Sequence, residues 1–520
     1  MGEKIRLVFP RAGIVILAAF LLLTLQGAAL GQAETAGALT YTVKPGDTLI
    51  KICSAFREQT NHYALNDLLN DIRRANNLNS NLLRIGQKLE IPVLAPRPVP
   101  RVRHRVKEGA EVRGIYLTGP ACGVSTVWQR VDGFVESGGN TVVFDAKDID
   151  GGVSFRSGHP LATWGKGRHA PVISSLPEMM KRFDRRGLYV VARLALFLDG
   201  ELGRQRPDLA LQDAGGQPWT ERGCTWIDAG HPEARAYNIA LARELAAAGV
   251  DEIQFDYVRF PTNGWRDDWS GEQTEDLEQV AARRREVISG FLAAARDSLQ
   301  GMGVKISADL YGIMAWGRME DLALTGQHVP TIARLVDVIC PMIYPSHFGP
   351  GFEGRRRPGD DPEYFIGEGT RRFVEQAAGQ AEIRPWLQAF AYRVTSYDGR
   401  YIERQVVSAR EAGGEGWCLW NPSCRYQTAL AVMPGLTGQP PMAAAEPAPM
   451  LATAPAAAAP EAEPQVAVRP EPPVSPVDKV AAPVKILHRD SPATMLGAMV
   501  ANQDAKDRRS GQDKAANRQN

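Results

Sequence analysis

Two runs near the middle of the sequence each place an aspartate within an apolar, alternating stretch. Asp256 lies in DEIQFDYVRFP at 251–261, and Asp309 lies in SADLYG at 307–312. Paired carboxylates suit acid–base and nucleophilic chemistry: in a retaining glycosidase, one protonates the leaving oxygen and the other attacks the sugar across about 5–5.5 Å. Close like charges also raise one pKa, as a general acid at neutral pH requires. We therefore predict Asp256 and Asp309 as a catalytic pair.

Both acids are expected to point into a barrel near the ends of neighbouring strands. In residues 252–261, the apolar alternates must pack on helices, which leaves Gln254 and Asp256 on the inward face. The same alternation in residues 305–312 turns Asp309 inward. Adjacent strands lie about 4.8 Å apart, so the two carboxyl groups can reach the spacing of a retaining pair.

Further polar and aromatic residues are expected at the same strand ends and in the loops that follow. Carboxylates, amides and aromatic rings together suit a carbohydrate, whose hydroxyls need paired hydrogen bonds and whose ring faces stack on Trp and Tyr. The predicted substrate-binding residues are Asp145, Lys147, Arg193, Gln254, Arg259, Tyr311, Tyr344, His347, Gln388, Trp420 and Asn421. Three alternatives stay open: a structural Asp145–Lys147 pair, Arg193 as a charge partner for a carboxylate, and His347 as a loop residue.

The elements that position these residues alternate along 111–435. Eight apolar strand candidates occur at 112–118, 141–148, 189–197, 252–261, 305–312, 336–345, 385–391 and 416–422. Amphipathic stretches between most of them, such as 176–186, 232–248 and 277–299, read as helices. This order predicts an α/β fold, a (β/α)8 TIM barrel, with its reactive groups at the carboxyl ends of the strands. A doubly wound sheet is the alternative, but the Gly-rich turn of nucleotide-binding folds is missing after the first strand.

The barrel segment resembles the DUF4015 family of glycoside hydrolase domains. The resemblance rests on DEIQFDYVRFP and SADLYG, together with PMIYPSH at 341–347, RPWLQ at 384–388 and WCLWNPS at 417–423. It implies a TIM barrel distantly similar to α-amylase-type barrels, with Asp256 as nucleophile and Asp309 as acid/base. Two departures stand out. The amylase pattern has Arg two residues before its nucleophile, where this chain has Gln254, and its acid/base is Glu rather than the shorter Asp309.

Residues 41–93 read as a small strand–helix–helix–strand module. The run YTVKPGDTL at 41–49 and the run LLRIGQKLEIP at 82–92 resemble the two ends of a LysM domain. That resemblance implies binding of N-acetylglucosamine-containing glycans such as peptidoglycan. The residues where the family forms its groove are Gly46, Asp47, Thr48, Leu49, Asn79, Asn81 and Leu82. The alternative is that these residues only cap helices and turn the chain.

The remaining segments are expected to be targeting or connecting sequence. Residues 1–35 combine three basic residues with an apolar run at 12–30, which predicts a signal peptide or a membrane anchor over 12–31. Everything after it would be exported to the periplasm, the cell envelope or the medium. Residues 94–110 form a basic, Pro-rich linker, and residues 436–520 form a low-complexity, disordered tail.

Composition narrows the function. Sixty basic and 59 acidic residues give a net charge of +1, which argues against a general nucleic-acid binder. Six cysteines without a CxxC and scattered histidines predict no metal site, no cofactor and no metal-dependent deacetylase; a Cys122–Cys424 disulfide is a guess, with Cys340 and Cys418 as buried thiols. The leading hypothesis is an exported glycoside hydrolase cleaving an envelope or extracellular polysaccharide. The alternative is a non-catalytic envelope glycan-binding protein with a degenerate barrel.

Overall fold

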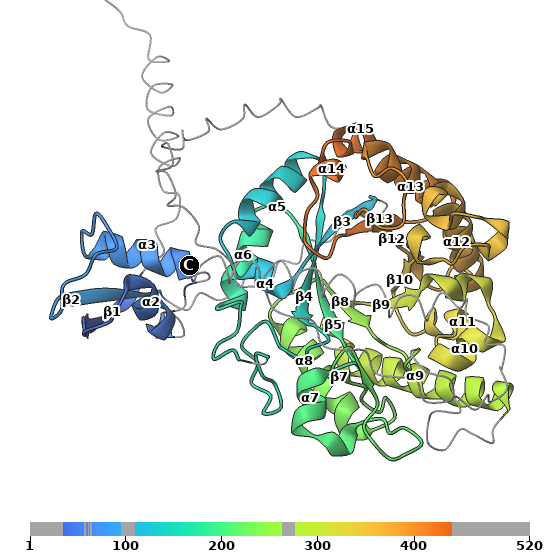
Figure 1. Ribbon diagram of the computed structural model, residues 1–520, viewed down its shortest axis with the longest axis horizontal. Coiled ribbons are helices and arrows are strands. Elements are labelled where there is room, and N and C mark those ends of the chain that lie inside the picture. The colour runs from blue at the N-terminus through green and yellow to red at the C-terminus, as the bar shows by residue number, and fades with distance from the viewer. Residues whose placement is uncertain are drawn as a thin grey trace, which may run out of the picture.

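The computed structural model describes residues 35–438 apart from 57–58, 61, 63–64, 95–109, 166 and 263–275. Nearly all of the predicted signal or anchor segment, most of the predicted linker and nearly all of the predicted tail lie outside the described residues. The last helix, Met433–Thr437, extends two residues past the predicted start of the tail. Within the described part of the chain, no helix is both long and apolar enough to cross a bilayer. Two folded units follow one another along the chain, a small N-terminal module and a barrel (Figure 1).

The N-terminal module has the predicted strand–helix–helix–strand order. β1 (Thr35–Thr42) pairs antiparallel with β2 (Lys88–Leu94), and α2 (Leu49–Phe56) and α3 (Leu65–Ala75) lie between them in sequence. Leu49, Leu68 and Leu89 are among the buried residues that join the helices to the sheet. Its α3 contacts the barrel, because Asp67 accepts a 2.7 Å hydrogen bond from Arg182.

The second unit is a closed barrel of parallel strands. Its strands are β3 (Val112–Leu117), β4 (Thr141–Lys147), β5 (Tyr189–Ala195), β8 (Glu252–Asp256), β9 (Lys305–Tyr311), β10 (Val338–Met342), β11 (Glu382–Ile383), β12 (Trp386–Gln388) and β13 (Gly416–Trp420). β11 pairs with β10 and β12 pairs with β13, although both belong to one stretch interrupted at Arg384 and Pro385. That stretch is the seventh stave and closes the cylinder, so the predicted (β/α)8 class is confirmed.

Helices surround this cylinder in Figure 1. They are α4 (Gly119–Cys122), α5 (Val127–Glu136), α6 (Leu176–Asp184), α7 (Gly200–Gln205), α8 (Pro232–Ala247), α9 (Leu277–Leu299), α10 (Met319–Thr325), α11 (Val329–Ile332), α12 (Pro362–Ala377), α13 (Gly399–Glu411), α14 (Gln427–Leu430) and α15 (Met433–Thr437). Side-chain caps fix several starts: Ser175, Asp276 and Asp398 each accept a backbone N–H from the first turn. After β5, a hairpin of β6 (Thr220–Glu221) and β7 (Cys224–Thr225) precedes α8.

Strand alternation divides the barrel into two cores. Residues such as Phe144 and Phe255 pack outward among the helices. The inward core consists of Tyr116, Val143, Tyr189, Val191, Val338, Cys340, Tyr344, Trp386 and Cys418. Below it, Glu252 accepts two hydrogen bonds from Arg384 and one from the Tyr189 hydroxyl. The interior is therefore filled with side chains, as is usual for a barrel of this class.

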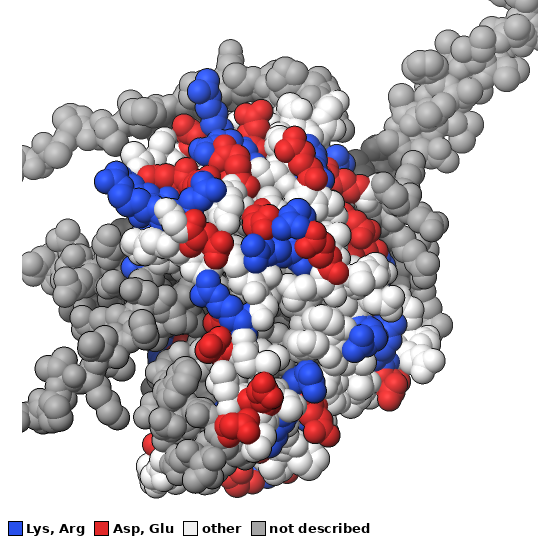
Figure 2. Space-filling model, turned by 90° about the vertical axis from the view of Figure 1, so that its right-hand side faces the viewer, with Lys and Arg blue, Asp and Glu red and all other residues white. Residues whose placement is uncertain are grey.

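The surface charges are mixed rather than gathered by sign. Figure 2 shows basic and acidic side chains interspersed on the face that it presents. On α12, for example, Arg371 contacts both Glu368 and Glu375. This face offers no basic stripe for a nucleic-acid backbone.

The guessed disulfide is not present. All six cysteines are free thiols. The Cys424 sulfur instead accepts the backbone N–H of Thr118 at 3.3 Å, while Cys122 is fully buried. Cys340 and Cys418 are buried thiols inside the barrel, as predicted.

Candidate active site

The structure brings the two predicted carboxylates together at the ends of β8 and β9. Arg193 of β5 donates to Asp256 Oδ2 from Nη2 at 2.6 Å and from Nε at 3.0 Å. The same Nε lies 3.9 Å from Asp309 Oδ2. Because both oxygens lie so near one nitrogen, they are separated by less than the sum of these two distances. Asp256 and Asp309 thus form a close carboxylate pair beside one guanidinium.

A local backbone change fixes Asp256. Tyr257 has φ of 51°, the left-handed region that non-glycine residues seldom adopt. This conformation ends β8 and directs the Tyr257 N–H onto Asp256 Oδ1 at 2.6 Å. Three N–H donors, two of them from Arg193, therefore point at the Asp256 carboxyl group. Its side chain is 7% exposed. Strain of this kind is characteristic of functional sites.

Asp309 lies deeper. Its side chain is 1% exposed, and Oδ1 accepts a 2.7 Å hydrogen bond from Trp386 Nε1. Burial raises the pKa of Asp309 well above its usual range, and the neighbouring Asp256 charge raises it further, against the opposing effects of Arg193 and Trp386. The pair therefore holds one carboxyl group biased toward its protonated form and one surrounded by hydrogen-bond donors.

Arg193 also contacts two acids at the end of β4. Its Nη1 donates to Asp145 Oδ1 and lies 3.7 Å from Asp148. The Tyr116 hydroxyl donates to the other Asp145 oxygen. Burial raises the pKa of Asp145 to about 7, although Arg193 opposes this. Four carboxyl groups thus surround a single cation, which leaves the cluster rich in negative charge.

Aromatic rings form one side of the cluster. Trp420 stacks on Tyr116 with ring centroids 4.0 Å apart, and Trp386 meets Trp420 edge-on at 5.4 Å. The Arg193 guanidinium lies 5.3 Å from the Trp420 ring. Burial, followed by the charges of Asp309 and Asp256, raises the pKa of Tyr344 well above its usual range. Trp420 and Tyr344 thus lie beside the charged cluster, and their contact with substrate stays a prediction.

Lys147 is placed elsewhere, which corrects its prediction as a site residue. Asp145 pairs with Arg193 in the β4–β5 register and Lys147 pairs with Leu194, so a bulge intervenes. The bulge turns Lys147 out of the barrel, where its ammonium group contacts Asp199 at 2.6 Å and Asn238 at 2.9 Å. Lys147 therefore belongs to a buried ion pair behind the sheet.

Three predicted amide residues are occupied by the protein itself. The Gln388 side chain accepts from the Ser346 hydroxyl and donates to the Phe390 carbonyl at 3.0 Å. Asn421 donates to the Ala389 carbonyl at 2.5 Å. The Gln254 side chain is buried inside the barrel and donates to the sulfur of Cys340 at 3.2 Å. These contacts fit structural roles for Gln388 and Asn421, while Gln254 keeps one buried side-chain oxygen without a hydrogen-bond partner; substrate binding by the three amides stays a prediction.

The other three predicted residues support the site from the side. Arg259 is buried with its guanidinium 4.5 Å from the Tyr311 ring and 5.1 Å from the Tyr257 ring. It thereby packs against the strained Tyr257 that follows the Asp256 carboxylate. His347 packs on Tyr344 at 4.8 Å, and burial lowers the pKa of His347 to about 3, so its imidazole is neutral.

Sequence reasoning missed Tyr116, Tyr257 and Trp386. Tyr116 and Trp386 lie on the inward alternates of their strands, two residues after Gly114 and two before Gln388 respectively. The alternation that found Asp256 could have found both rings. The left-handed backbone of Tyr257 has no comparable signal in the sequence.

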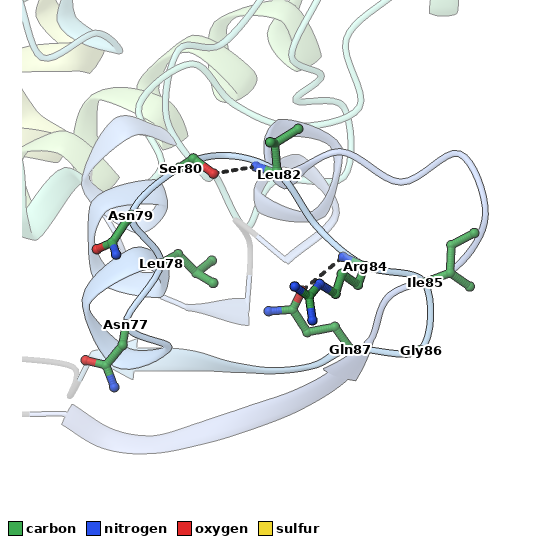
Figure 3. Close-up of a pocket in the computed structure, with 9 residues that line it drawn as sticks. All are labelled: Asn77, Leu78, Asn79, Ser80, Leu82, Arg84, Ile85, Gly86 and Gln87. Carbon is green, nitrogen blue, oxygen red and sulfur yellow. Dashed lines mark hydrogen bonds between the residues drawn. The ribbon is translucent and has the colours of Figure 1, made fainter.

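A second candidate site is a hollow on the N-terminal module (Figure 3). It has a volume of about 630 Å³ and is lined by Asn77, Leu78, Asn79, Ser80, Leu82, Arg84, Ile85, Gly86 and Gln87. Leu78 points toward Arg84 and Gln87, and Leu82 and Ile85 project from the rim, 85% and 71% exposed. Asn79 and Leu82 are thus at the hollow, as expected for glycan contacts, and Asn81 is not among its lining residues.

The other predicted loop of this module is built for turning and capping. Gly46 has φ of 82°, and Asp47 accepts hydrogen bonds from the Lys44 N–H and the Tyr41 hydroxyl, both at 2.7 Å. Thr48 accepts the Lys51 N–H at the start of α2, and Leu49 is buried in the module core. These contacts match the capping alternative for this loop.

Family comparison agrees with both units. Residues 114–426 match the model of DUF4015, described as "Putative glycosyl hydrolase domain". The chain belongs to this family. Residues 41–92 match the LysM domain model. No curated protein matches the chain.

Several solved structures are similar to parts of this chain. A hypothetical protein from Ruminiclostridium thermocellum is 32% identical over 38% of this chain and 96% of its own, with a TM-score of 0.32. The PgaB glycoside hydrolase domain from Bordetella bronchiseptica is 16% identical over 62% of this chain and 99% of its own, with a TM-score of 0.47. The spore cortex-lytic enzyme SleL from Bacillus cereus is 13% identical over 76% and 85%, with a TM-score of 0.36.

Within the described residues, no group of three or more His, Cys, Asp or Glu side chains is arranged to hold a metal ion. The acids of the site are gathered around the Arg193 guanidinium instead. Carboxyl groups arranged in this way can supply acid–base and nucleophilic chemistry.

Proposed function

We propose that this protein is an exported glycoside hydrolase that cleaves a polysaccharide of the cell envelope or medium by a retaining mechanism. The observation that carries the proposal is the close approach of Asp256 and Asp309 to one nitrogen of Arg193. A carboxyl group biased toward its protonated form, beside a second one that accepts three N–H groups, at the carboxyl end of a barrel supports such chemistry.

In the first step, the Asp309 carboxylic acid gives its proton to the glycosidic oxygen while Asp256 attacks the anomeric carbon. The bond between that carbon and the glycosidic oxygen breaks, and the aglycone leaves as an alcohol. In the second step, Asp309, now a carboxylate, takes a proton from water, and the resulting hydroxide displaces Asp256 from the sugar. Two inversions at the anomeric carbon retain its configuration.

Arg193 makes up for one departure from the amylase pattern. Gln254 occupies the position two residues before the nucleophile, and its side chain is directed to Cys340. Arg193, from the neighbouring β5, contacts Asp256 with two N–H groups. The cation that the nucleophile needs for orientation is thus supplied from a different strand.

The LysM module would hold the enzyme on peptidoglycan or another N-acetylglucosamine-containing glycan. The hollow between Asn77 and Gln87, with the exposed Leu82 and Ile85 at its rim, supports this role. Apolar side chains beside amides suit a sugar, whose ring face is apolar and whose edge is polar. Envelope glycan as the target agrees with export directed by residues 1–35.

The test is incubation of the full chain with peptidoglycan and a panel of exopolysaccharides, with release of reducing ends as the readout. Proton NMR of the first product reports its anomer. We expect release by the wild-type chain, retention of configuration, and loss of release in Asp256→Asn. An inverted product, or a fully active Asp256→Asn, would contradict the mechanism.

A second candidate function is glycan binding without hydrolysis. The 1% exposure of Asp309 favours it, because substrate must displace the residues that cover this acid. The two functions separate cleanly: a binder retains glycan in pull-down, releases no reducing ends from any member of the panel, and binds equally well as Asp256→Asn.

A further inference from the structure

We propose that Asp145 is a positioning residue for the nucleophile: its carboxyl group anchors the Arg193 guanidinium, and Arg193 in turn orients Asp256. The inference rests on the proposed function. It gives Asp145 a task other than the substrate contact expected from the sequence.

The guanidinium is held at opposite edges. Arg193 Nη1 donates to Asp145 Oδ1, while Nη2 and Nε donate to Asp256 Oδ2 at 2.6 and 3.0 Å. A planar guanidinium held on both sides cannot turn without losing a charge-assisted hydrogen bond. The direction in which Arg193 presents its N–H groups to Asp256 therefore depends on Asp145.

Asp145 is itself fixed and has little room for a sugar. Its second oxygen accepts the Tyr116 hydroxyl, Tyr116 stacks against Trp420, and Asp145 is almost fully buried. The resulting chain of contacts is Trp420, Tyr116, Asp145, Arg193 and Asp256. These residues come from β13, β3, β4, β5 and β8, which are consecutive in the sheet, and each strand contributes one link.

The anchor depends on charge and therefore on pH. Asp145 faces Arg193 from β5, Tyr116 from β3 and Asp148 from its own connecting loop, and it influences the thiols of Cys122 and Cys424. Burial raises the pKa of Asp145 to about 7. As pH falls below that value, Asp145 becomes neutral and its hold on Arg193 weakens, so turnover should fall.

The experiment compares full-length wild type, Asp145→Asn, Tyr116→Phe and a matched control, Asp199→Asn. Asp199 is also a buried acid in an ion pair, with Lys147, but it lies outside the barrel. For Asp145→Asn we expect kcat to fall on the order of 10²-fold, as for other misplaced catalytic groups, at nearly unchanged KM. The fall in kcat that wild type should show below about pH 7, the acidic limb of its profile, should disappear in this variant. Tyr116→Phe should lose less, and Asp199→Asn should keep both kcat and the limb.

A crystal structure of Asp145→Asn provides a readout that does not depend on turnover. We expect Arg193 to leave its two-bond contact with Asp256. An unchanged contact, an unchanged kcat, or an effect confined to KM would overturn the proposal. If wild type cleaves nothing, the proposed function fails while the crystal structure still decides the role of Asp145. If Asp145→Asn does not fold, the pH profile of Tyr116→Phe decides it.

Discussion

Two buried ion clusters flank strands β4 and β5, one on each side of the barrel wall. Outside, Lys147 has one carboxylate partner, Asp199, and one amide partner, Asn238, so the charges cancel. Inside, Arg193 faces four carboxyl groups. Burial of excess negative charge is costly and raises the pKa of Asp145 and of Asp309. A fold tolerates such an imbalance where chemistry uses it, and this supports our proposal that the inner cluster is the active site.

One extra residue separates the two clusters. Asp145 and Lys147 would share a face in a regular strand, but the bulge between them sends the acid inward and the base outward. Without it, the ammonium group of Lys147 would lie among the acids and could neutralise one of them. The bulge therefore keeps the inner cluster acidic.

The largest expected effect is on the inner cluster. Asp256→Asn should lower kcat by roughly 10³-fold or more, because the amide cannot form the covalent intermediate. Its thermal unfolding should stay close to that of wild type, since the amide still accepts the Tyr257 N–H. Reducing-end release and circular dichroism measure the two. If Asp256→Asn lost activity only because it unfolded, the Arg193 cluster would be structural like the Lys147 cluster, and the contrast between them would be contradicted.

Asp309→Asn should lower kcat by about 10²–10⁴-fold, the usual contribution of a general acid. It should also stabilise the fold above about pH 4, the usual value for an unfolded Asp. The folded pKa of Asp309 is raised, so the native state binds more protons than the unfolded state, and wild-type stability falls as pH rises through this window. Thermal melts of both proteins at pH 4 and pH 8 check the sign. An equal melting difference at both pH values would contradict it.

The outer pair should behave in the opposite way. Lys147→Met leaves Asp199 buried without its cation and should destabilise the fold by about 3–5 kcal/mol, the usual result of breaking a buried pair. Turnover per folded molecule should be unchanged. Urea unfolding together with active-site titration separates the two readouts. A large fall in turnover without loss of stability would indicate instead that Lys147 takes part in the active site.

The smallest expected effect tests the charge balance directly. Asp148 is 51% exposed and raises the pKa of Asp145 through its charge. Asp148→Asn should therefore lower the pKa of Asp145 and move the limb near pH 7 toward acid, with a stability change within about 0.5 kcal/mol. A kcat profile of the variant measures the shift. An unchanged profile would mean that the charge of Asp148 does not influence Asp145, and a shift toward alkaline pH would contradict the sign of that influence.

Strand alternation predicted the barrel and brought Asp256, Asp309 and Arg193 to one place, because inward and outward positions repeat every two residues. The prediction was wrong for Lys147, since a bulge changes the alternation without any mark in the sequence. For Gln388 and Asn421, which hydrogen-bond within the protein, substrate binding stays a prediction. A polar residue at a strand end serves either a ligand or a neighbouring loop, and only the folded loop decides between them.

The N-terminal module shows the same ambiguity between ligand binding and local capping, and its two predicted groove loops differ in the outcome. Asp47 and Thr48 proved to be turn and cap residues, because Asp and Thr side chains compete well for nearby backbone N–H groups. The apolar Leu82 side chain cannot make such a hydrogen bond, and its exposure at the hollow could not be predicted from its residue type.

The interruption of the seventh barrel strand at Arg384 and Pro385 should affect local opening of the barrel. Proline at 385 has no N–H to give to a neighbouring strand, and the two pieces on either side, Glu382–Ile383 and Trp386–Gln388, form only short ladders with β10 and β13. Amide hydrogen exchange should accordingly be fastest along this seam, with the long ladder between β4 and β5 exchanging last. Trp386, which donates a hydrogen bond to Asp309, belongs to this interrupted strand. Transient opening of the strand would therefore expose the buried carboxyl group of Asp309 to solvent.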